Sequence, residues 1–135
     1  MAGHLVASAI RPGVVWCSSA CRARETLDLL RPAIGADAEV HVTERVYDAD
    51  ADELLELLQA VEATVASVMI VGHNPALQDL AIRLCGDGDD AALAQLHARF
   101  PAGALATLDL GDVCWPELGP GRAFLVSLIV PRRAT

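Results

Sequence analysis

The feature that most constrains the fold is an alternation between short apolar runs and amphipathic stretches. Two apolar runs, VVWC at 14–17 and SVMIV at 67–71, are each followed at once by small polar residues and then by helical spacing. A short apolar run between turn signals is typical of a buried strand, and the second run suits a central strand of a parallel sheet. Strands that alternate with helices in this way predict an α/β layer fold with a mostly parallel sheet.

The other expected elements continue this alternation. Pro32 is expected to stop the first helix, Asp50 and Glu53 are spaced as a capping box, and Ser18 and Ser19 can cap the helix that follows them. Helices are predicted at 20–30, 51–65, 75–85 and 90–98, and further strands at 39–46, 104–110 and 123–130. Residues 4–9 have the pattern of another helix end. With no repeat or linker, residues 1–135 are expected to form one domain.

Charge and composition exclude several classes of protein. The formal net charge is −8, whereas nucleic-acid binders need clustered Lys and Arg. No apolar run approaches the ~20 residues of a membrane span, and the N-terminus lacks a secretory pattern, so a cytoplasmic location without membrane contact is expected. The four cysteines lack metal-ligand spacing and are expected to be reduced packing residues. We predict no metal and no cofactor.

The two strand-to-helix junctions, VVWC-SSACRA and VMIV-GHNPAL, are the strongest candidates for a site. In open α/β sheets ligands bind beyond the carboxyl ends of the strands, where helix N-termini favour anions. Arg22 lies in the first turn of one helix, and His73 stands just before Asn74, the expected N-cap of the other. Together they would suit a phosphoryl group. The alternative is that Arg22 pairs with Glu25 and that His73 is a hydrogen-bonded loop residue.

Other motifs give weaker signals. The run DADAD at 48–52 resembles the start of a calcium-binding EF-hand loop, but the required glycine position holds Glu53. A helix-start acidic cluster is the simpler interpretation. No G-x-S-x-G elbow surrounds Ser18 or Ser19, which argues against a serine hydrolase.

At this point two motifs resemble a known family. CSSACRARET resembles the S-x-x-x-R-A-x-x-T motif of the histidine phosphatase superfamily, which is phosphoglycerate mutase-like. VGHNPALQDLA resembles the second-histidine motif of its phosphohistidine phosphatase branch, related to SixA. ERVYDADADELLELL and FPAGALATLDL also fit that branch. The resemblance implies a three-layer α/β/α sandwich, and a hydrolase that forms a phosphohistidine intermediate and releases phosphate with water.

The resemblance also assigns residue roles. Arg22 falls on the phosphate-binding arginine and His73 on the second histidine of the pocket, so these two are the expected catalytic residues. Ser18 is expected to support the phosphate, and Asn74 is the other candidate substrate-binding residue, although capping the helix suits it better. Glu44 and Asp48 follow a strand and are candidates for a leaving-group acid. The implied partner is a phosphorylated small molecule or a phosphohistidine protein.

The sequence departs from the family at its start. The superfamily's Arg-His-Gly motif on the first strand supplies the attacking histidine, and it does not occur here. His4 cannot replace it, because it lacks the flanking Arg and Gly. Either the start was assigned too late or the chain was shortened; or the chain is a phosphate- or phosphoprotein-binding pseudophosphatase; or another chain supplies the strand, since a missing strand exposes unpaired backbone. A homo-oligomer stays among the options, and the substrate stays open.

Overall fold

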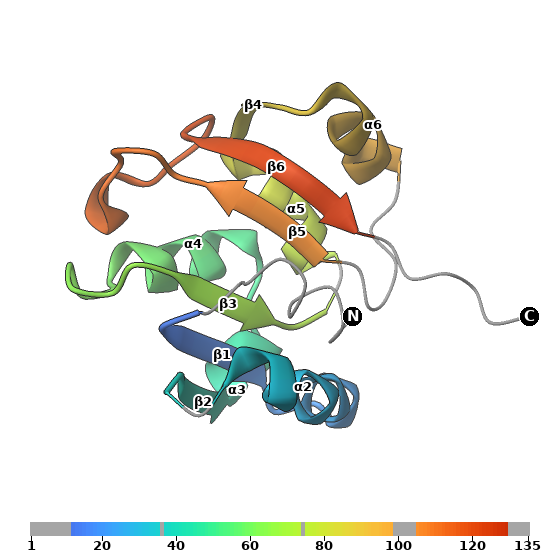
Figure 1. Ribbon diagram of the computed structural model, residues 1–135, viewed down its shortest axis with the longest axis vertical. Coiled ribbons are helices and arrows are strands. Elements are labelled where there is room, and N and C mark those ends of the chain that lie inside the picture. Colours follow the sequence, from blue (N-terminus) through green and yellow to red (C-terminus); the bar gives the residue numbers. More distant parts are fainter. Residues whose placement is uncertain (1–11, 36, 74, 99–104, 130–135) are drawn as a thin grey trace, which may run out of the picture. The chain divides into compact units, whose positions relative to one another are not determined.

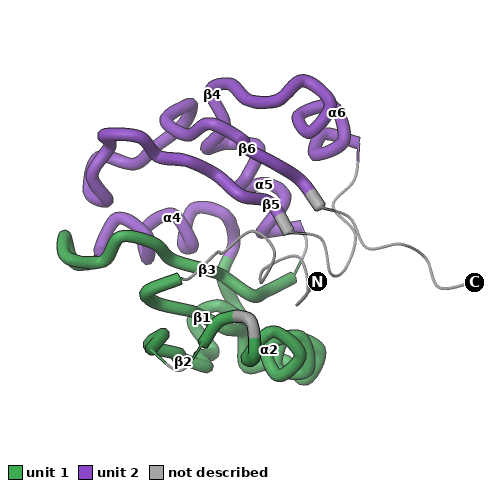
Figure 2. The backbone as a smooth tube through the Cα atoms, viewed as in Figure 1, with its two compact units in different colours: residues 1–49, 62–73 green, residues 50–61, 74–135 purple. Residues whose placement is uncertain are grey.

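The computed structural model describes residues 12–35, 37–73, 75–98 and 105–129. The chain divides into two compact units, each containing one three-stranded sheet (Figures 1 and 2). Unit 1 comprises residues 1–49 and 62–73, and unit 2 comprises residues 50–61 and 74–135. The helix expected at 4–9 and residue Asn74 lie outside the described residues. The helix after Asn74 begins at Ala76 with Pro75 as its N-cap, so the expected cap at Asn74 is wrong by one residue.

The sheet of unit 1 is parallel throughout, in the order β2-β1-β3. β1 (Val14–Ser18) pairs with β2 (Glu39–Thr43) on one side and with β3 (Val68–Val71) on the other. Val15 and Cys17 are fully buried, as a middle strand requires. The run at 67–71 therefore forms an edge strand of this sheet and not the expected central one, because apolar residues indicate burial but not the number of neighbouring strands.

Two helices complete unit 1, and both correct an expected boundary. α2 (Cys21–Ile34) continues through Pro32, because Leu30 and Ile34 are both buried and their packing retains the last turn despite the missing N–H. α3 (Glu44–Tyr47) occupies part of the expected strand 39–46. The chain turns there because Thr43 caps the new helix: its Oγ1 accepts a hydrogen bond from the Arg45 N–H at 3.1 Å.

Unit 2 is built around β6 (Ala123–Ile129), the middle strand of the order β4-β6-β5. β6 runs parallel to β4 (Cys85–Gly88) and antiparallel to β5 (Leu105–Asp109). Its core joins Leu125, on β6, to the buried Leu96 of α6. The helices of this unit are α4 (Ala51–Gln59), α5 (Ala76–Leu84), α6 (Asp90–Ala98) and the 3₁₀ turn η1 (Trp115–Glu117).

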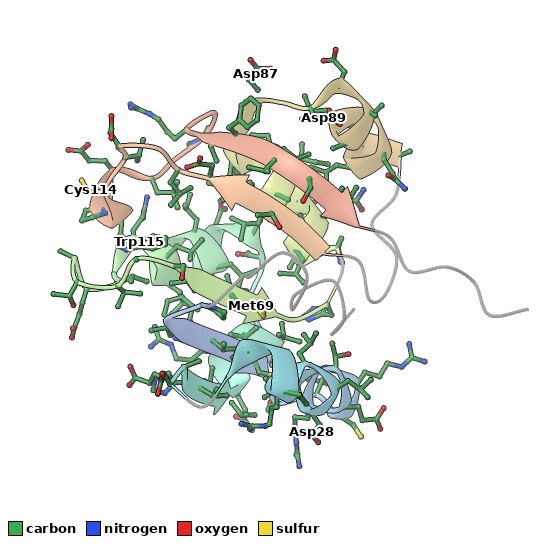
Figure 3. All side chains as sticks on the ribbon, viewed as in Figure 1. Asp28, Met69, Asp87, Asp89, Cys114 and Trp115 are labelled. Atoms are coloured by element: carbon green, nitrogen blue, oxygen red, sulfur yellow. The ribbon has the colours of Figure 1, made fainter. Side chains whose placement is uncertain are left out.

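Unit 2 confirms some expected elements and corrects others. The Asp50–Glu53 capping box is present and α6 has the expected bounds, but α4 ends at Gln59 and not at residue 65. Gly86 was expected to end α5, yet it belongs to β4, a strand that the glycine-rich loop pattern did not predict. An added Cβ at Gly86 would lie 2.2 Å from the Gly121 carbonyl oxygen, so a glycine is needed for this close approach to the neighbouring chain segment. Asp87 and Asp89 flank the end of β4 (Figure 3).

The α/β fold with mostly parallel strands is confirmed. Among the described residues three of the four strand pairs are parallel, and the β5–β6 pair is antiparallel. The strands are divided between two sheets, whereas the sequence pattern predicted one, because periodicity identifies strands without specifying their partners. In the described part of the chain, no helix has both the length and the apolar composition needed to cross a membrane.

Candidate functional site

The two junctions singled out in the sequence leave the same edge of one sheet. β1 and β3 are neighbouring parallel strands, and Cys17 lies opposite Val71. Ser18, which ends β1, and Gly72–His73, which follow β3, therefore both lie at the carboxyl edge. On the other side of β1, Ser18 lies opposite Thr43, where β2 ends and α3 begins. Three strand ends of unit 1 thus converge where α/β sheets bind ligands.

Ser18 shapes the turn between β1 and α2. It is fully buried, and its Oγ accepts a hydrogen bond from the Ala20 N–H at 3.1 Å. The N-cap of α2 is Ala20, which lies one residue beyond the two serines expected to cap the helix. Because an alanine side chain has no acceptor, the first N–H groups of α2 receive no side-chain cap, and the positive end of the helix dipole lies at this turn.

Arg22 lies in the first turn of α2 with an exposed side chain. Of the ion pairs found between described residues, none contains Arg22. Glu25, the acid that could have paired with it, instead accepts a weak hydrogen bond from Cys21 Sγ at 3.4 Å. The Arg22 guanidinium is therefore paired with no described acid, which leaves it able to contact an anion.

His73 is exposed and contacts an aromatic ring that the sequence analysis did not select. The Tyr47 ring centroid lies 6.4 Å from that of His73, with an angle of 46° between the planes. Tyr47 is the last residue of α3 and is half exposed. The available signal was its position just after a predicted strand. Only the acids at this strand end, Glu44 and Asp48, were selected, as candidates for proton transfer, so Tyr47 between them was passed over.

Glu44 and Asp48 begin and cap the short helix α3, and both are exposed. They thus lie beside the same strand end as Tyr47, which keeps them as candidates for a leaving-group acid. Among the described residues, no group of three or more His, Cys, Asp or Glu side chains is arranged to hold a metal ion.

Burial affects two of the cysteines. It raises the pKa of the Cys17 thiol, on β1, and the pKa of the Cys85 thiol, at the start of β4. The cause is desolvation, which disfavours the charged thiolate. Cys17 and Cys85 therefore behave as the packing residues that the sequence predicted, whereas Cys21 and Cys114 are exposed.

Comparison with known proteins yields both uncharacterized relatives and solved structures. No protein-family model matches the chain. An uncharacterized protein of Mycobacterium leprae (strain TN) is 37% identical over 119 residues, which cover 87% of this chain and 71% of the relative. One from Mycobacterium tuberculosis (strain ATCC 25618 / H37Rv) is 36% identical over 132 residues, covering 96% and 80%.

Three solved structures that match this chain are those of SixA proteins. The candidate phosphohistidine phosphatase SixA of Nakamurella multipartitia superposes with a TM-score of 0.77 at 29% identity, covering 96% of this chain and 77% of that one. Its counterpart from Agrobacterium tumefaciens gives a TM-score of 0.74 at 27% identity, covering 96% and 75%. This chain belongs to the SixA-like branch of the histidine phosphatase superfamily.

A third structure, the protein histidine phosphatase SixA complexed with tungstate, shares the fold, with a TM-score of 0.71 at 21% identity. Its alignment covers 95% of this chain and 74% of that one. The two SixA-like motifs of this chain, CSSACRARET and VGHNPALQDLA, begin at neighbouring strand ends of unit 1. The SixA-like fold thus brings together two motifs that lie about fifty residues apart in the sequence.

Proposed function

We propose that this chain contains the phosphoryl-binding part of a phosphohistidine phosphatase. The observation that carries the proposal is the pairing of β1 with β3, which brings the Arg22 and His73 junctions to one edge of one parallel sheet. Arg22 would hold two non-bridging oxygens, and the His73 imidazole would donate a hydrogen bond to the same group. The uncapped N–H groups at the start of α2 add positive potential at this edge.

The other two predicted residues have supporting roles in this proposal. Ser18 is buried and engaged with the Ala20 N–H, so it would act by shaping the turn that presents Arg22. Asn74 follows His73 directly in the chain, and its role in substrate binding stays a prediction. Glu44 or Asp48 would supply the leaving-group proton, although an imidazole leaving group needs less assistance than an alkoxide.

The full reaction needs an attacking histidine, which would take the phosphoryl group before water releases phosphate. The 135 residues contain no Arg-His-Gly sequence, and they span 71–80% of the length of the mycobacterial relatives. We therefore expect these residues alone to bind a phosphoryl group without turnover. A longer chain with that motif would be the hydrolase, and its substrate a phosphohistidine protein or a small phosphorylated molecule. A pseudophosphatase is the alternative function.

The first experiment measures oxyanion binding to the 135-residue chain by calorimetry. Tungstate is the probe, because a SixA protein of the same fold has been solved in complex with it. Arg22→Ala and His73→Ala should each weaken binding by roughly tenfold or more, as expected when a charged hydrogen bond of about 1.5–3 kcal/mol is lost. If tungstate fails to bind the parent chain, or binds both variants as tightly as the parent chain, the proposed site is wrong.

Two matched controls separate the site from general charge effects. Arg24→Ala removes the same charge from the same helix, but residue 24 is about 200° around the helix from residue 22. His41→Ala removes an exposed histidine that pairs with Glu39 on β2. Both variants should bind tungstate as the parent chain does.

A second experiment distinguishes an enzyme from a pseudophosphatase. The chain is compared with a version extended upstream, using phosphohistidine and an aryl phosphate as substrates. Turnover only in the extended version, abolished by His73→Ala, supports the phosphatase. Oxyanion binding without turnover in either version supports the pseudophosphatase.

A further inference from the structure

Tyr47 contributes a contact to the candidate site that neither of the two family motifs contains. His73 is exposed and lies two residues beyond the last residue of β3. An exposed histidine at a strand end can adopt several staggered rotamers, and these direct its ring to different places around the sheet edge. In the described part of the chain, the contact found for the His73 ring is the aromatic one with Tyr47.

The geometry of this contact is that of a true aromatic pair. The 6.4 Å between ring centroids lies within the range of about 4.5–7 Å for interacting rings, and the 46° tilt is far from an unfavourable face-to-face stack. Half of the Tyr47 side chain remains exposed, so the ring is not placed there by core packing alone.

The Tyr47 backbone, in contrast, is held firmly. Val46, its neighbour in α3, is only 2% exposed, and α3 contacts β1. Thr43 caps the start of the helix, and the Asp48 N–H donates to the Glu44 carbonyl at its end. A fixed backbone supports a ring that can restrict the histidine beside it.

We propose that Tyr47 is a positioning residue that restricts the His73 ring to orientations suited to binding the phosphoryl group. This proposal rests on the proposed function of the site. Restricting the ring before binding reduces the entropy lost when the anion arrives, so Tyr47 strengthens binding without touching the anion. The aromatic ring, and not the hydroxyl group, is the part that acts.

The test combines tungstate binding with NMR of the His73 ring in the 135-residue chain. Tyr47→Leu should weaken binding by about two- to tenfold, the range expected from the loss of one aromatic pair. Tyr47→Phe should keep most of the binding. The His73 ring protons should shift in the leucine variant because the ring current disappears, whereas those of His41 should not.

Three results would count against Tyr47. Unchanged binding in Tyr47→Leu, when His73→Ala still weakens it, overturns the positioning role and leaves the proposed function intact. Equal loss in the phenylalanine and leucine variants assigns the effect to the hydroxyl and also overturns it. If neither Arg22→Ala nor His73→Ala changes binding, the proposed function fails first, and the NMR shift then reports a contact without that role.

Discussion

At the scale of single residues, the candidate site depends on how short side chains turn the backbone. Ser18 accepts from the Ala20 N–H, and Thr43 accepts from the Arg45 N–H, each bonding two residues ahead. Both lie at the ends of neighbouring strands, opposite each other in the sheet. These two local turns direct α2 and α3 away from the sheet and so place Arg22 and Tyr47 at its edge.

Replacing Thr43 tests this role. Thr43→Ala should lower the free energy of unfolding by about 1 kcal/mol, because the N-cap hydrogen bond is lost, and Thr43→Ser should recover most of it. Urea denaturation measures both. Thr64→Ala, in an exposed turn, serves as the matched control and should change stability little. Equal losses in the alanine and serine variants would show that the cap is not the cause.

Sequence reasoning at this scale identified the residue types better than their partners. Arg22 and His73 were selected correctly as residues of one edge, because each follows a buried strand whose direction the α/β pattern determines. Ser18 and Ser19 were expected to cap α2, but the N-cap is Ala20. Ser18 is instead the last residue of β1, and its side chain is fully buried. Tyr47 was missed because only acids were selected at that strand end, and an aromatic contact with His73 depends on the pairing of distant segments.

At the scale of elements, β4 shows that a glycine-rich sequence can form a strand where a loop would be expected. The sequence CGDG has weak strand propensity, yet it pairs with β6. An added Cβ at Gly86 would approach the Gly121 carbonyl oxygen to 2.2 Å, and one at Gly88 would approach the Leu125 Cβ to 2.7 Å. Propensity rules could not anticipate this, because the close approach involves a segment more than thirty residues away.

Gly86→Ala should therefore be costly. The added methyl group would meet backbone atoms that cannot rotate away, so we expect a loss of about 1–3 kcal/mol in the free energy of unfolding. Gly119→Ala is the matched control, since nothing lies within 4 Å of its added Cβ. Thermal denaturation followed by circular dichroism compares them. A stable Gly86→Ala protein would mean that the two segments can separate.

At the scale of the whole molecule, strand pairing is what the sequence pattern could not predict. The alternation of 14–17, 20–30 and 67–71 correctly indicated an α/β fold, because each apolar period depends only on nearby residues. The division into two sheets depends on contacts between distant segments. The antiparallel direction of β5 is likewise fixed by its pairing with β6, and not by the sequence ALATLDL itself.

Burial of thiols makes the stability of the whole chain depend on alkaline pH. The folded state raises the pKa of Cys17 above its ordinary value of 9.0, mainly through desolvation. A raised pKa means that folding favours the protonated thiol. The stabilisation is complete below about pH 9, near the pKa of an unfolded thiol, and is lost as the pH rises through the folded pKa.

Urea denaturation between pH 7 and 10 under reducing conditions measures this effect. The free energy of unfolding should fall toward pH 10, and Cys17→Ala should reduce that fall, although Cys85 retains a similar contribution. Cys114→Ala, at an exposed thiol, should leave the pH dependence as it is in the parent chain. A fall of the same size in the Cys17→Ala protein would rule out ionisation of this thiol as its cause.

The discontinuity of unit 1 has a consequence for protein synthesis. Its first 49 residues carry β1, α2, β2 and α3, but β3 arrives only after residues 50–61, which belong to unit 2. Until residue 71 has left the ribosome, β1 can pair with β2 on one side, but its partner on the other side, β3, has not yet emerged. Arg22 is therefore presented on an unfinished sheet for the time that about thirty further residues take to be translated. A chaperone or ribosome surface that shields this edge would protect the nascent chain from pairing with its neighbours.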